Sequence, residues 1–250
     1  MGCSRLIGAP LAPGDAETLE LLRAGREAEA EVILPDDVRN SDAAPLELSR
    51  DLFLKNVRSA ARGRAPSLTG ARSEHLRILL TSSRASADLA EVADRLAQAQ
   101  VPPRARDVFA LGGMTAHIKE HEPRRKIRGT VAGDVLRRFT SRTLMQQQRD
   151  KLEQSCAPYQ FGLGTRAGTD ALALFLRFVT DLNARRVVLA TDCAGAYDTI
   201  RRATMLTEIL AKHPELLVYV RQFYGRASVY IWIDEHGVPH VINQSSGGEQ

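Results

Sequence analysis

The stretch of sequence that decides the fold reads RRVVLATDCAGAYDTI and spans residues 185–200. Its apolar run at 187–190 has the length and the β-branched composition of a buried strand. Asp192 would then lie at the end of that strand, where a carboxylate can face a cleft without being buried unpaired. Cys193 and the two small residues after it would let a large substrate approach the backbone closely. An acid at a strand end suits Mg²⁺, which takes oxygen ligands, although an ordinary strand followed by an Asp-initiated turn or helix has the same pattern.

The composition is typical of a globular intracellular chain. Of the 250 residues, 44% are hydrophobic and 26% are charged, which allows one large domain or two small ones. The three cysteines lie far apart with no CxxC pair, which predicts a reducing compartment and argues against a disulfide framework or a zinc site. The sequence has no signal-peptide core and no apolar run near the roughly 20 residues of a membrane span. We therefore expect an intracellular chain of the nucleus or cytoplasm that is neither secreted nor bound to a membrane.

A dense group of basic residues lies at 124–142. The net charge of the whole chain is only +4, yet Asp134 is the one acidic residue in this segment. Its basic residues are Arg124, Arg125, Lys126, Arg128, Arg137, Arg138 and Arg142. Such local density suits contacts with phosphate groups. A solvated helix face is the alternative interpretation.

Hydrophobic periodicity predicts an α+β chain whose N-terminal region is mainly helical. Helices are predicted at 15–30, at 45–61, from Ser73, from an N-cap at Ser86, from Asp134 to Pro158, at 169–182, at 205–211 and at 214–224. The helix after Ser86 would turn Leu89, Val92 and Leu96 to one side. Two hairpins are predicted, a basic one at 115–131 and a second one at 228–242. The N-terminal region could be partly disordered, because its apolar pattern is weak.

Five landmarks occur along the chain in a fixed order. They read APSLTG at 65–70, RGTVAGDVLRR at 128–138, QFG at 160–162, TDCAGAYD at 191–198 and GGEQ at 247–250. Together they resemble the reverse transcriptase domain of non-LTR (LINE-type) retrotransposons. The family's corresponding motifs read A-P-G-P-D-G, R-P-I-A-V-G-D-V-L-R-R, Q-F-G, the L-D-F-x-x-A-F/Y-D motif A and the start of motif B. The resemblance covers residues 60–250.

The resemblance implies a fold and an activity. Residues 61–250 would form the fingers and part of the palm of a right-hand polymerase, truncated within motif B, after an N-terminal extension at 1–60. The implied activity is that of an RNA-directed DNA polymerase, which uses an RNA template, a DNA primer and deoxynucleoside triphosphates. The reaction would be two-metal phosphoryl transfer with Mg²⁺.

The resemblance also implies roles for six residues. Asp192 would be the catalytic residue that binds both Mg²⁺ ions, and the carbonyl of Cys193 would help to hold one of them. Four residues would bind the incoming nucleotide, with Arg128 and Lys119 on its triphosphate, Tyr197 against its sugar and Gln250 close by.

The chain departs from the family at several places. Gly129 replaces the usual proline, Thr191 replaces an apolar residue, and the basic hairpin is longer than usual, which weakens the match of Lys119. The motif C acidic pair and the thumb are not among the 250 residues, so we expect this fragment to be inactive by itself. A non-catalytic nucleic-acid-binding module derived from a retroelement is the alternative. A different Mg²⁺-dependent phosphotransferase using Asp192 and Asp198 is disfavoured, because a strand followed by a turn would put Asp198 on another face.

Overall fold

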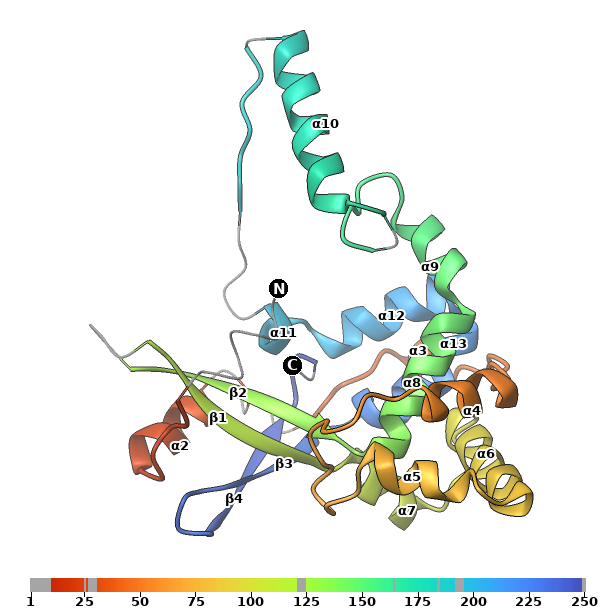
Figure 1. Cartoon of the computed structure of the whole chain (residues 1–250). Coiled ribbons are helices and arrows are strands. Elements are labelled where there is room, and N and C mark those ends of the chain that lie inside the picture. Colours follow the sequence, from red (N-terminus) through yellow and green to blue (C-terminus); the bar gives the residue numbers. More distant parts are fainter. Residues whose placement is uncertain are drawn as a thin grey trace. The chain divides into compact units, whose positions relative to one another are not determined.

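The computed structural model describes residues 10–24, 26, 31–120, 125–163, 165–183, 185–191 and 196–248 (Figure 1). The fold is α+β, as the sequence predicts, and combines many helices with a four-stranded mixed sheet. The chain divides into two compact units, one formed by Met1–Leu144 with Gly195–Gln250 and the other by Met145–Ala194. Within the described residues, no helix has the length and apolar character needed to cross a membrane.

The sheet of the first unit joins two hairpins that lie far apart in the sequence. Its strands are β1 (Gly112–Glu120), β2 (Lys126–Gly133), β3 (Ser228–Ile233) and β4 (Pro239–Gln244). Their order is β2-β1-β3-β4, with antiparallel pairs within each hairpin and a short parallel pair between β1 and β3 (Figure 1). Both predicted hairpins are confirmed.

Helix α2 (Ala16–Arg23) covers one face of this sheet. Its N-cap is Asp15, whose carboxylate accepts a hydrogen bond from the backbone N–H of Thr18 at 2.8 Å. Leu22 is completely buried and belongs to a cluster with side chains of the three strands β1, β3 and β4. The members of this cluster are Ala12, Leu22, Met114, Ala116, Tyr230, Trp232 and Ile242. The helix predicted at 15–30 is therefore present, but it ends at Arg23.

A second cluster forms the helical core of the same unit. Its helices are α4 (Arg50–Arg58), α5 (Ser73–Leu79), α6 (Ser83–Ala97), α7 (Pro103–Ala110), α8 (Val135–Gln147) and α13 (Pro214–Tyr224). Phe53, Leu96 and Phe139 are among its buried side chains. The N-cap of α6 is Ser82 rather than Ser86, because the Ser82 hydroxyl accepts from the N–H of Ala85. Val92 is 42% exposed, so it does not share the buried side of α6 with Leu89 and Leu96.

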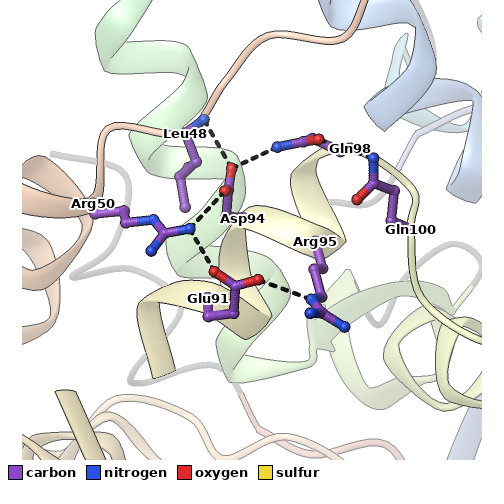
Figure 2. Close-up of polar contacts among 7 residues, drawn as sticks. All are labelled: Leu48, Arg50, Glu91, Asp94, Arg95, Gln98 and Gln100. Carbon is purple, nitrogen blue, oxygen red and sulfur yellow. Dashed lines mark hydrogen bonds and ion pairs between the residues drawn. The ribbon is translucent and has the colours of Figure 1, made fainter. Parts of the chain in front are cut away.

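A polar network fastens the start of α4 to α6 (Figure 2). The carboxylate of Asp94 accepts hydrogen bonds from the backbone N–H of Leu48 at 3.2 Å and from the Gln98 side chain at 2.9 Å. Arg50 binds the other oxygen of Asp94 at 3.2 Å and also pairs with Glu91. The buried carboxylate is thus satisfied from three sides.

Helices α3 (Asp36–Arg39) and α12 (Arg202–Lys212) also belong to the first unit. Helix α3 contributes Val38 and α12 contributes Leu206 to a small third cluster with Leu217 of α13. Pro214 is the first residue of α13, a position that needs no N–H donor. The helices predicted at 205–211 and 214–224 are confirmed.

The second unit contains α9 (Arg149–Cys156) and α10 (Gly168–Leu182). The long helix predicted from Asp134 to Pro158 is interrupted, since α8 ends at Gln147 and α9 begins after Gln148.

The prediction of a buried strand at 187–190 is wrong. Residues 185–191 form neither a helix nor a strand, and the side chains of Val187 and Leu189 are 90% and 84% exposed. A strand in a core needs neighbours that pair with its backbone N–H and C=O groups. None of β1–β4 pairs with this run.

Candidate functional site

The β1-β2 hairpin carries two of the predicted nucleotide-binding residues. Because Met114 and Ala116 face the core under α2, side chains at the alternating positions of β1 lie on the opposite face of the sheet. His117 belongs to that face and is paired in register with Arg128 of β2. Lys119 is exposed, beside an irregularity in the register between Ile118 and Glu120. The structure therefore places Lys119 and Arg128 on one hairpin.

Gly129 lies on the crowded face of β2. A Cβ atom added there would be 3.0 Å from the sulfur of Met114 and 3.1 Å from a methyl carbon of Leu22. It would also be 3.3 Å from the guanidinium of Arg26. A residue without a side chain at this position therefore lets α2 lie close to the strand.

Several arginines of the predicted basic cluster are engaged within the protein. Arg125 donates two hydrogen bonds to the Asp15 carboxylate, at 2.8 and 2.9 Å, and also pairs with Glu17. These bonds hold the pKa of the Asp15 carboxyl well below its usual range. Arg137 is buried and its guanidinium lies 4.1 Å from the ring centre of Phe223. The cluster is therefore not one continuous basic face.

The helix that contains Tyr197 meets the loop that follows β4. Helix α11 (Ala196–Thr199) carries Tyr197, whose side chain is 59% exposed. The backbone N–H of Gly248 donates to the carbonyl of Tyr197 at 2.6 Å, and that of Gly247 donates to the carbonyl of Ile200 at 2.7 Å. Two motifs about fifty residues apart in the sequence are thus joined by backbone hydrogen bonds.

Arg202 fixes this junction and was not singled out from the sequence. It is 2% exposed, and its Nε donates to the carbonyl of Gly247 at 2.9 Å. Its two Nη atoms donate to the carbonyl of Arg226 at 2.6 Å and to the hydroxyl of Ser228 at 3.0 Å. An arginine at the start of a helix carries no signal of burial, because its partners lie on segments distant in the sequence.

The remaining predicted site residues lie outside the described residues. These are Asp192, Cys193 and Gln250, together with the side chain of Asp198. In the part of the chain that the structure describes, no three His, Cys, Asp or Glu side chains form a group able to hold a metal ion.

A cavity of about 410 Å³ lies on the α2 side of the sheet. Met114, Trp232 and Asp234 are among its lining residues, and none of the predicted site residues lines it. Asp234 is already bound to His240 at 2.9 Å and accepts from two backbone N–H groups of the β3-β4 turn. This acidic rim does not suit a phosphate.

Neither the comparison with models of known protein families nor the search of curated protein sequences gives a match for this chain.

Proposed function

We propose that residues 61–250 belong to a reverse transcriptase-like domain that takes part in template-directed DNA synthesis. The observation that carries the proposal is the junction between α11 and the loop at 245–248. Backbone hydrogen bonds join Tyr197 to Gly248 and Ile200 to Gly247, as expected if motifs A and B line one nucleotide site. The order of the five sequence motifs supports the same reading.

The basic hairpin supports binding of a triphosphate. Arg128 and Lys119 make no ion pair or side-chain hydrogen bond with any residue that the structure describes, whereas Arg125 is paired with Asp15. A guanidinium presents several donors in a plane and suits phosphate oxygens. Phosphoryl transfer depends mainly on positioning and on neutralising charge. In the proposal Arg128 and Lys119 neutralise the phosphates, and Tyr197 lies against the sugar.

Mg²⁺ would supply the remaining charge neutralisation when bound. Asp192 and the carbonyl of Cys193 would hold it. Two metal ions roughly 3.5–4 Å apart need several carboxylates, so the proposed centre requires acidic ligands in addition to Asp192.

A binding experiment tests this function. We measure the rate at which a duplex of DNA primer and RNA template dissociates from the protein. Mg²⁺ is present throughout, and each of the four deoxynucleoside triphosphates is added in turn. We expect the complementary nucleotide to slow dissociation more than the other three do. Arg128→Gln should remove this difference. Arg84→Gln, an equal change of charge on the exposed side of α6, should keep it.

The same measurement separates the proposal from its alternative. A non-catalytic nucleic-acid-binding module would bind the duplex equally with all four nucleotides. Tight binding without any preference for the complementary nucleotide would therefore contradict the polymerase reading and favour the module.

A further inference from the structure

A small basic pocket lies where the loop before α5 meets α8. Its volume is about 40 Å³. The residues that line it are Arg64, Ser73, Val135, Arg138, Phe139 and Arg142. Three guanidinium groups, one hydroxyl and two apolar side chains thus surround it, and no carboxylate does.

The charges of the pocket are only partly balanced by the protein. Arg64 and Arg142 form no ion pair or side-chain hydrogen bond within the described ranges. Arg138 donates from Nη2 to the carbonyl of Ala65 at 2.8 Å, while its Nε is buried without a hydrogen-bond partner in the described structure. Burial, and to a smaller extent the charge of Arg64, lower the pKa of Arg138, although Asp134 opposes this. Like charges are therefore crowded into one small space.

The neighbouring acids are engaged elsewhere. Glu74 accepts a hydrogen bond from the backbone N–H of Gly63 at 2.7 Å, and Asp134 accepts from that of Leu136 at 2.8 Å. Neither side chain lines the pocket. An anion from outside would meet three positive charges there.

The loop that carries Arg64 is held in place on both sides. Arg77 donates to the carbonyl of Ala60 at 2.8 Å, and the Ser73 hydroxyl donates to the carbonyl of Ala61 at 3.3 Å. On the other side, the N–H of Ser67 donates to the carbonyl of Ala71 at 2.8 Å. A site built on such a loop loses little conformational entropy when a ligand binds.

We propose that Arg64, Arg138 and Arg142 bind a phosphate group in this pocket. The inference does not depend on the proposed polymerase function, because none of the residues that the function uses lines the pocket. A free phosphate ion carries a charge of about −1.5 to −2 near neutral pH, a phosphodiester of a nucleic-acid backbone carries a single negative charge, and Arg forks match the oxygens of both. The volume is roughly that of three water positions, which suits one phosphate group rather than a base or a sugar. The phosphate could be a free ion or part of a nucleic-acid backbone.

Inorganic phosphate is the first probe. Thermal unfolding of the full chain is followed in phosphate and in sodium chloride of equal ionic strength. We compare the wild type with the double variant Arg64→Gln/Arg142→Gln. The control is Arg84→Gln/Arg104→Gln, which removes two charges from exposed positions. Phosphate should raise the midpoint of the wild type and the control, and the rise should be lost in the double variant.

A labelled single-stranded oligonucleotide is the second probe, measured by fluorescence anisotropy over a range of salt. If a backbone phosphate occupies the pocket, the double variant should bind more weakly than the control. Its slope of log affinity against log salt should then be smaller by about 0.7. If the ligand is a free phosphate, only the unfolding midpoint should respond to the double substitution. A wild type that binds neither probe, or a double variant that binds both like the wild type, would overturn the proposal. The phosphate probe involves no template and no selection of a nucleotide. Its result can therefore be interpreted even if the proposed polymerase function is wrong.

Discussion

Asp94 shows how one buried carboxylate can hold two segments together. Burial raises its pKa, but the hydrogen bonds from Gln98, Arg50 and the Leu48 amide outweigh this, and the net shift is downward. Asp94→Ala leaves the buried N–H of Leu48 without its acceptor (Figure 2). We expect a loss of about 1–3 kcal/mol in the free energy of unfolding, measured with urea. Asp88→Ala changes an exposed residue of the same helix and should cost less than about 0.5 kcal/mol. Equal losses in the two variants would contradict the role of the network.

Glu74 makes a pH-dependent contribution at the residue scale. The hydrogen bond from the Gly63 amide is the main cause that lowers the pKa of Glu74 from 4.5 to about 2. A carboxyl whose pKa is lower in the folded state stabilises the fold fully above its unfolded pKa. That stabilisation is lost as the pH falls through 4.5 toward 2. Glu74→Gln should therefore lower the urea midpoint at pH 7 and flatten its decline between these pH values. A variant whose acid profile parallels that of the wild type would show that this hydrogen bond contributes nothing.

At the scale of elements, Arg202 couples α12 to β3 and to the loop after β4. Arg202→Gln cannot reproduce donation to Gly247, Arg226 and Ser228 together, and it leaves buried acceptors unpaired. We expect a loss of at least about 3 kcal/mol in stability. Amide hydrogen exchange should also become faster at Gly247 and Gly248 than at β1 residues, because the loop loses its anchor. Uniform acceleration across the sheet would indicate global destabilisation instead.

Patterns that depend on neighbours in sequence predicted the elements well. Alternation placed both hairpins, and Pro214 marked the start of α13. The errors arose where one short sequence pattern is compatible with two different structures. Helix α7 is absent from the predicted elements, because consecutive prolines also mark the end of a helix, yet Pro103 occupies the first turn of α7, where proline is favoured.

Contacts between distant segments were not predictable from the sequence. The apolar run at 187–190 has a strand's composition, but composition does not tell which strands lie beside it. The same limit applies to the residues of the candidate site. Arg128 and Tyr197 were found through their motifs, whereas the burial of Arg202 and the pocket of Arg64 with Arg138 depend on tertiary contacts.

At the scale of the whole molecule, the first unit is made of chain segments on either side of the second. The parallel pair of β1 with β3 and the packing of α3 with α12 connect residues before 145 to residues after 194. A cut within the second unit should therefore leave the first unit assembled. Residues 185–191 are exposed and lack a ladder of hydrogen bonds, so this segment is a favourable cleavage site.

Limited trypsin digestion tests this arrangement. We expect the first cuts in the second unit, at Arg185 or Arg186 or at another exposed arginine outside its helices such as Arg166. The two products should separate in denaturing gels but migrate as one species in size-exclusion chromatography, because β1 and β3 stay paired. The buried strand expected from the sequence would instead protect Arg185 and Arg186, since a protease needs an extended, accessible backbone. Early cleavage within α4 or α6, or separation of the products under native conditions, would contradict the division into these units.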